Sequence, residues 1–315
     1  MSIINTFVDS WRGVQSRLAE SAQILRLQPL RLMGRTTSKS RLEDLIKDSS
    51  WPNHPEINHN DKIQNYILEI ANLNKIIAFL EGDGFALGLN LPQKLTEEIW
   101  EFAMHTPCYG NNETKLGFFY SEKEQAQAKH GNPFISGHYY NTALLCPVIK
   151  ALETDPLLLE IATRYLETEP LHQGNQLWWS FPVESTVYER RRAAQMFYCT
   201  LENCRCLNFS FYITDVDLCS NPHVCVRGSH MKKKHSHRFL EGGCSYQEIT
   251  KYYGYENIVP ICGKAGSGFV EDTLCFHKKT VPSSKERLTL QIQFADRKFG
   301  IQSDRIDASQ LESIL

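Results

Sequence analysis

Two stretches of alternating residues decide the fold: CLNFSFYI at residues 206–213 and RLTLQIQF at residues 287–294. In each stretch every second residue is apolar, and polar or small residues stand between. Side chains of a β-strand point alternately to the two faces of a sheet, so a period of two predicts a strand with one apolar and one polar face. Both stretches are therefore expected to be strands that turn one face to a hydrophobic core.

Helices are expected before these strands. Apolar residues between Ile63 and Leu80 mostly recur at steps of three and four, the spacing of one helix face. Asp61 can cap the start of this helix and Gly82 can end it. A second helix is expected over about residues 92–104.

The strongest helix signal begins at Asp155, which can serve as N-cap while Pro156 takes the first helical position. An apolar stripe follows as far as Leu166. Several strands after a run of helices indicate an α+β fold, a sandwich or barrel flanked by helices.

The composition of the chain limits the classes of function that are expected. The chain has 315 residues, of which 42% are hydrophobic and 22% charged, with a formal net charge of −2. A near-neutral balance gives no basic surface for nucleic acid or anionic lipid. No apolar run approaches the roughly 20 residues of a membrane helix, and there is no secretory leader at the start. A cytoplasmic protein that binds a small molecule is expected, and the sequence does not address its oligomeric state.

The N-terminal part differs from the rest. Residues 11–41 are rich in arginine and poor in acids, which fits an amphipathic helix with a solvated basic face or, alternatively, an organelle transit peptide. Residues 36–60 are polar and rich in turn formers. We therefore expect a helical extension and linker over residues 1–60 and one main domain over residues 61–315.

Cysteines are numerous but not arranged as a metal motif. Eight of the ten lie between Cys199 and Cys275, and none form a CxxC pair. Disulfide scaffolds are usually much shorter secreted chains. Reduced, mostly buried thiols are expected.

Several segments in a fixed order make the chain resemble a known family. From about residue 82 to 300 it is similar to the phytanoyl-CoA dioxygenase-like family of Fe(II)/2-oxoglutarate oxygenases, and the resemblance implies a double-stranded β-helix, a cupin-like jelly roll. The segments that carry it are EGDGFALG (81–88), DPLLLEIATRYL (155–166), LWWSFP (177–182), AAQMFYCTLEN (193–203), FYITDVD (211–217), NPHVCVRGSH (221–230), GKAGSGFVEDTLCFHK (263–278) and ERLTLQIQFA (286–295).

The resemblance also implies a site. The family holds Fe(II) with a His-x-Asp pair and a second histidine, leaving positions open for 2-oxoglutarate and O₂. His277 matches the second histidine, and Arg287 matches the arginine that grips the far carboxylate of 2-oxoglutarate. Gln195 and Thr289 are taken as further cofactor-binding positions.

The chain departs from the family at the His-x-Asp pair, where Tyr198 and Thr200 stand. Lys279 replaces the glycine usually found after the second histidine. A phenol with a pKa near 10 is a poor Fe(II) ligand at neutral pH. His277 is then the only retained triad position, and ordinary iron-dependent activity is expected to be absent or strongly impaired.

Other residues could rebuild a metal shell around His277. Cys275 lies two residues before it, and Cys206 lies on the polar face of its strand. His223 and His230 are interpreted as hydrogen-bonding groups of a loop. A further cluster is read as a solvated loop or, alternatively, a contact for an anionic substrate: Lys232, Lys233, Lys234, His235 and His237.

Three functions stay open. The first is a non-catalytic or repurposed relative that binds 2-oxoglutarate or a similar dicarboxylate through Arg287 and needs no metal. The second is an oxygenase of the hydroxylase type with Fe(II) in a rebuilt shell. The third is a metal-independent enzyme with Tyr198 as general acid and His277 as base. Alternatively, Arg287 is a structural residue paired internally with Glu271 or Asp272.

Overall fold

Within one compact unit of the chain, Asn65–Leu315, the computed structural model describes residues 68–70, 72–182, 196–199, 205–220, 222–234, 243–278, 284–298 and 304–315. The expected N-terminal extension and the predicted site positions Gln195 and Thr200 lie outside the described residues. So do Lys279, His235 and His237.

A nine-stranded sheet, called here the large sheet, dominates the described part of the chain. Its strands follow the spatial order β1-β2-β12-β8-β14-β6-β5-β3-β4 and pair antiparallel. The strands are β1 (Glu69–Ile70), β2 (Phe85–Asn90), β3 (Cys108–Gly110), β4 (Gly117–Phe118), β5 (Ser136–Tyr139), β6 (Leu171–Ser180), β8 (Cys206–Tyr212), β12 (Ser267–Asp272) and β14 (Arg287–Ala295).

A second layer faces the large sheet. The small sheet has the order β11-β9-β13, from β11 (Ile258–Ile261), β9 (His223–Val226) and β13 (His277–Lys278). A two-stranded ribbon pairs β7 (Met196–Phe197) with β10 (Cys244–Ser245). Tyr198, the residue after β7, forms an antiparallel bridge with His277 and so joins the ribbon to the edge of the small sheet.

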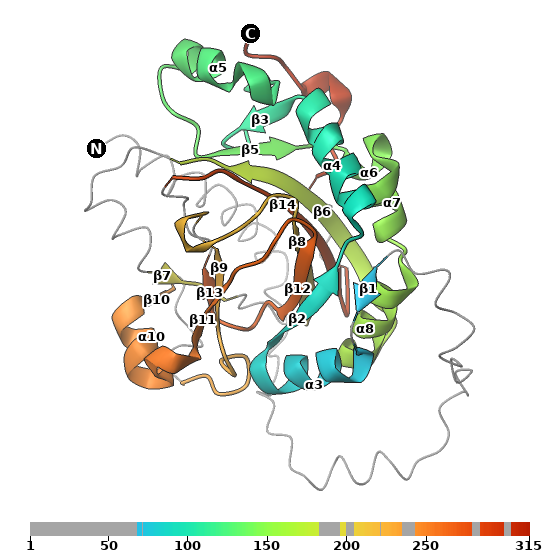
Figure 1. Ribbon diagram of the computed structural model, residues 1–315, viewed down its shortest axis with the longest axis vertical. Coiled ribbons are helices and arrows are strands. Elements are labelled where there is room, and N and C mark those ends of the chain that lie inside the picture. Colours follow the sequence, from blue (N-terminus) through green and yellow to red (C-terminus); the bar gives the residue numbers. More distant parts are fainter. Residues whose placement is uncertain are drawn as a thin grey trace, which may run out of the picture. The chain divides into compact units, whose positions relative to one another are not determined.

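Helices cover the opposite side of the large sheet. Figure 1 shows α3, α4, α6, α7 and α8 along that side, with the small sheet across the large sheet from them and α10 beside β7 and β10. The helices are α3 (Leu73–Asp83), α4 (Gln93–His105), α5 (Lys123–His130), α6 (Thr142–Leu145), α7 (Pro147–Leu152), α8 (Pro156–Leu166) and α10 (Tyr246–Tyr253), with short 3₁₀ turns at Tyr120–Glu122, Leu218–Ser220, Tyr255–Asn257 and Ala308–Gln310.

Strands β8 and β14 have the predicted alternation. Their apolar residues, such as Phe209 and Leu290, belong to the main hydrophobic cluster together with residues of α3, α4 and α8. The polar residues between them are buried as well, apart from the half-buried Gln293, because they face the space between the two sheets. The expected strands and the α+β arrangement are thus confirmed, and the polar face of each strand forms the interior of the barrel.

The helix predictions hold with one correction. Helix α8 begins as expected: the Asp155 carboxylate accepts hydrogen bonds from the backbone N–H groups of Leu157 and Leu158. Helix α4 begins after Pro92.

The helix expected from Asp61 to Gly82 is confirmed from Leu73 onward, but residues before Leu73 that were expected to be helical are not. The chain forms strand β1 at Glu69–Ile70, and α3 starts only after Asn72, whose side chain caps it. It ends at Gly84 in the left-handed conformation (φ 85°), where a glycine is favoured. The apolar spacing runs across a strand and a helix, so periodicity alone could not place the boundary.

Within the part of the chain that the structure describes, no helix has both the length and the apolar character needed to cross a bilayer.

Candidate functional site

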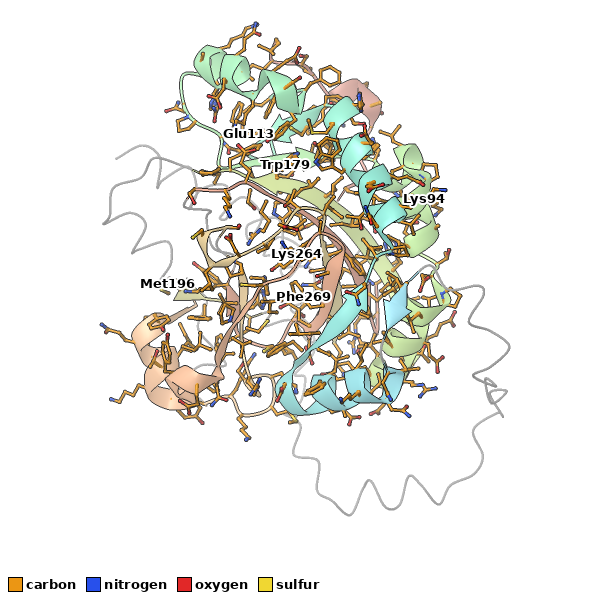
Figure 2. All side chains as sticks on the ribbon, viewed as in Figure 1. Lys94, Glu113, Trp179, Met196, Lys264 and Phe269 are labelled. Carbon is orange, nitrogen blue, oxygen red and sulfur yellow. The ribbon has the colours of Figure 1, made fainter. Side chains whose placement is uncertain are left out.

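The barrel interior holds a small cavity between the large sheet and β9. It has about 10 Å³ of space, roughly the room of one water molecule. Arg287 and Thr289, both predicted as cofactor-binding residues, lie on its wall. Figure 2 labels Phe269 of β12, which lies between the two layers, and Met196 at the start of β7. The lining is completed by Trp178, Ser210, Tyr212, His223, Phe269 and Gln291.

Arg287 is buried to an unusual degree for an arginine. Only 3% of its surface is exposed, and its Nη2 donates to Ser180 Oγ at 3.4 Å. Burial lowers the pKa of its guanidinium, although the nearby Tyr212 hydroxyl acts in the opposite direction. A cation in this position favours any anion that can reach it.

The internal partners suggested for Arg287 are engaged elsewhere. Glu271 Oε2 lies 2.7 Å from His223 Nε2. Asp272 accepts a hydrogen bond of 2.6 Å from the Tyr165 hydroxyl, on the helix-facing side of the sheet. Both carboxylates are thus held by groups other than Arg287.

Tyr198 and His277 are held side by side at the edge of the small sheet. Each backbone N–H donates to the other's carbonyl at 2.8 Å. Residues directly opposite in an antiparallel pair point their side chains to the same face. Burial raises the pKa of the Tyr198 phenol above its ordinary value, so the phenol stays protonated at neutral pH.

The His277 ring has a defined orientation. Its Nδ1 lies 2.9 Å from the Cys275 carbonyl oxygen, which can only accept, so Nδ1 carries the proton. In the neutral ring Nε2 then holds the lone pair. The His277 ring stacks on that of His223 with centroids 5.5 Å apart and planes 23° from parallel.

His223 itself was misread from the sequence. It lies on strand β9, not in a loop, with 7% of its surface exposed. Its Nε2 contacts Glu271 Oε2, and the Cys225 thiol donates to the same oxygen at 3.3 Å. His230, by contrast, lies in a turn as expected, and its Nε2 contacts the Glu81 carbonyl at 3.1 Å.

Glu271 is fully buried at the centre of this group. Asn208 donates to its other oxygen, Oε1, at 3.2 Å. Burial alone would raise its pKa, but the facing imidazoles of His223 and His277 more than offset this and hold the pKa well below the usual range. The carboxylate is therefore ionised throughout the physiological range.

The predicted thiol ligands are not assembled. Cys206 packs against Ala295, and the Cys275 thiol donates to the Val226 carbonyl at 3.1 Å. The metal-binding group that the described residues do form is His223, Cys225 and Glu271, whose ligand atoms lie within 4.8 Å of one another. The two-residue spacing of His223 and Cys225 was the signal for a shared strand face.

A larger cleft lies outside the barrel, by α4 and α7. It has a volume of about 1000 Å³ and is bordered by Trp100, Leu145 and Lys264 among others. Figure 2 marks Lys94 and Lys264, both of which border it. It contains none of the predicted site residues, so the interior cavity is the candidate site.

Comparison with known proteins agrees with this architecture. HygX from Streptomyces hygroscopicus, solved with nickel and 2-oxoglutarate bound, aligns at a TM-score of 0.51 and 10% identity over 74% of this chain and 90% of that chain. This likeness supports the jelly-roll fold. AviO1 from Streptomyces viridochromogenes Tue57 aligns at a TM-score of 0.48 and 14% identity over 72% and 96% of the two chains.

No curated protein matches the sequence. The family model described as phytanoyl-CoA dioxygenase (PhyH) matches residues 114–294, which is more than half of the chain. The chain therefore belongs to the phytanoyl-CoA dioxygenase family.

Proposed function

We propose that this protein is a repurposed member of its family, one that binds a small carboxylic acid in the barrel interior and does not run iron-dependent oxidation. The family's Fe(II) requires two histidines and a carboxylate on one face. Tyr198 and Thr200 stand at two of these positions. The raised pKa of the Tyr198 phenol disfavours the phenolate, its ligating form. These residues do not fit the family's iron.

The observation that carries the binding proposal is Arg287 on the cavity wall. A guanidinium with 3% exposure, whose pKa burial has lowered, gains from a carboxylate that forms a bidentate ion pair with it. Thr289 and Gln291, on the same face of β14, can supply hydrogen bonds to the same ligand. The site therefore supports recognition of an acid better than oxidation of a substrate.

The size of the cavity sets the expected affinity. A space of about 10 Å³ must widen before a dicarboxylate enters, and this rearrangement costs binding free energy. Without chelation to a metal, a dissociation constant of about 1 mM, near −4 kcal/mol, is expected. 2-Oxoglutarate, the acid in the HygX structure, is the first ligand to test.

A second candidate is metal-independent acid–base catalysis. It is favoured by the bridge that puts the Tyr198 and His277 side chains on one face. The protonated phenol could act as general acid, and Nε2 of the neutral His277 ring could act as base. Here Tyr198→Phe would abolish turnover of a substrate while leaving acid binding through Arg287 intact.

Calorimetric titration with 2-oxoglutarate tests the first proposal. Wild type is expected to bind at about millimolar concentration, and Arg287→Ala to bind at least about tenfold more weakly. Arg297→Ala is the matched control, because Arg297 lies just beyond the same strand with a side chain that is 62% exposed. If all three proteins bind equally, another group holds the acid. If none binds at tens of millimolar, the binding proposal fails.

A further inference from the structure

Three side chains with metal-binding atoms, His223, Cys225 and Glu271, meet in the barrel interior, and the ring of His277 stacks on that of His223. His223 and Cys225 stand two apart on β9, so both point to the same face of the small sheet. His277 on β13 is the register partner of Cys225 and shares that face. Glu271 reaches them from β12 of the large sheet. Three strands from two sheets thus contribute to one cluster.

The distances suit a single small cation. The ligand atoms of His223, Cys225 and Glu271 lie within 4.8 Å of one another, and the shortest separation, Nε2 to Oε2, is 2.7 Å. Bonds of 2.0–2.3 Å in a tetrahedral zinc site put neighbouring ligand atoms about 3.3–3.8 Å apart. A cation between them therefore needs the histidine and the carboxylate to separate by about 0.6 Å or more, which is within the reach of side-chain rotation.

Outer hydrogen bonds already orient two of these groups. Metal-ligating histidines usually donate their other ring N–H to a carbonyl or a carboxylate. His277 does this through Nδ1 to the Cys275 carbonyl, so Nε2 keeps its lone pair. Asn208 donates to Glu271 Oε1, while Oε2 receives the contacts of His223 and Cys225. Glu271 Oε2 thus faces His223 and Cys225, and the His277 ring is stacked against His223.

The donor types select the metal. Magnesium and calcium prefer oxygen ligands, whereas a mixture of imidazole, thiolate and carboxylate is typical of zinc. Cys225 and Glu271 have no exposed surface, His223 has 7%, and His277 is half-buried. A buried carboxylate that faces two imidazoles and a thiol also makes a hydrogen-bonded ion pair without metal, and the experiment must separate these readings.

We propose that His223, Cys225, Glu271 and His277 form a zinc site that shares only His277 with the iron centre of the family. The site goes beyond the proposed function, because binding of an acid through Arg287 requires no metal. It also gives the chain a role for His277 after the loss of the His-x-Asp pair. Since His223 lines the cavity that holds Arg287, a zinc ion bound by His223 borders the space where the acid binds.

Metal binding is tested on the full chain, freed of metal by a chelator and then given Zn(II) or Co(II) alone. Wild type is expected to retain one equivalent of zinc after gel filtration. With cobalt it should show a thiolate-to-metal charge-transfer band and the intense d–d bands of tetrahedral geometry. His223→Gln and Glu271→Gln should each lower zinc affinity by at least about 100-fold, more than an outer-sphere change does. Cys225→Ser, the variant least disruptive to packing, should lose the charge-transfer band.

The control variants replace a cysteine and a histidine that lie outside the cluster. Cys206→Ser and His172→Gln should behave as wild type, since Cys206 packs against Ala295 and His172 contacts Asn175. Arg287→Ala should keep its zinc even if it loses the acid, so the two proposals fail separately. A wild type with no retained zinc and no thiolate band overturns the site. A loss of zinc in Cys206→Ser or His172→Gln equal to that in the cluster variants also overturns the site. So does a loss of zinc in Tyr198→Phe when Glu271→Gln retains zinc.

Discussion

Tyr198 and His277 lie opposite each other in an antiparallel bridge, each donating its backbone N–H to the other's carbonyl at 2.8 Å. The bridge holds the first position of the family's His-x-Asp pair beside the retained histidine. The bridge thus fixes the relative backbone positions of Tyr198 and His277.

This relationship predicts that iron binding can be restored. The double substitution Tyr198→His with Thr200→Asp returns the two missing ligands, and Fe(II) affinity should rise by at least about 100-fold, since first-shell ligands outweigh outer contacts worth 10–100-fold. Anaerobic titration with Fe(II) and 2-oxoglutarate, followed by the metal-to-ligand charge-transfer band, measures this. Tyr198→Phe serves as the control. Stoichiometric Fe(II) at micromolar affinity in wild type, with release of CO₂ from 2-oxoglutarate, would refute the proposed loss of iron chemistry.

The free energy of unfolding should fall in acid because the Glu153 carboxylate becomes protonated. Burial opposes its ionisation, but hydrogen bonds from Lys150 at 2.6 Å and Asn175 at 2.8 Å more than offset this and lower its pKa below the ordinary 4.5. A folded-state pKa below the unfolded value means that the stabilisation is complete above pH 4.5 and is lost as the pH falls through the lowered pKa.

Urea unfolding between pH 7 and pH 3 tests this linkage. Glu153→Gln should show a shallower loss of unfolding free energy across this window than wild type. Glu98→Gln is the control, because Glu98 is an exposed residue of α4 whose partner Lys94 is 4.0 Å away. Parallel pH profiles for wild type and Glu153→Gln would show that Glu153 is not the residue responsible.

Removal of one hydroxyl should weaken the contact between α8 and the large sheet. Tyr165 donates to Asp272 Oδ2 at 2.6 Å, and both residues are at most 3% exposed. Tyr165→Phe leaves a buried carboxylate short of a donor and should cost about 1–3 kcal/mol of unfolding free energy. Tyr255→Phe, at a residue 70% exposed, should change it little. Equal midpoints in denaturant for both variants would contradict the prediction.

Two glycines should respond to alanine with opposite signs. A Cβ at Gly268 on β12 would lie 2.4 Å from the Phe211 ring, so Gly268→Ala should cost about 1–3 kcal/mol through overpacking. A Cβ at Gly82 in α3 meets nothing within 4 Å, and Gly82→Ala should stabilise by up to about 1 kcal/mol through helix propensity. Thermal unfolding of the two variants gives the comparison, and a Gly268→Ala variant as stable as wild type would show that Phe211 yields without cost.

Local signals predicted most of the fold. Alternation in residues 206–213 and 287–294 gave β8 and β14, and the cap at Asp155 gave the start of α8. These signals are contained within a few neighbouring residues. The start of α3 was missed because Ile70 fits the helical spacing yet pairs with Leu89 in an edge strand.

Only part of the candidate site could be predicted from the sequence. Arg287 was assigned through the family resemblance and shares the polar face of its strand with Thr289, and both residues line the cavity. Glu271 and Cys225 meet only because two sheets pack face to face, and no spacing along the chain records that contact. His223 was taken for a loop residue as part of the segment NPHVCVRGSH, but it begins strand β9, which ends at Val226.

The division of β14 into a helix-facing row and an interior row has an evolutionary consequence. Substitutions among Leu288, Leu290 and Ile292 would disturb the packing that selects the native topology. Exchanges on the interior row change what the barrel recognises while the scaffold still assembles. Mutations can therefore change the chemistry of the barrel interior largely independently of the packing that determines the fold. A protein can lose one reaction in this way and still fold.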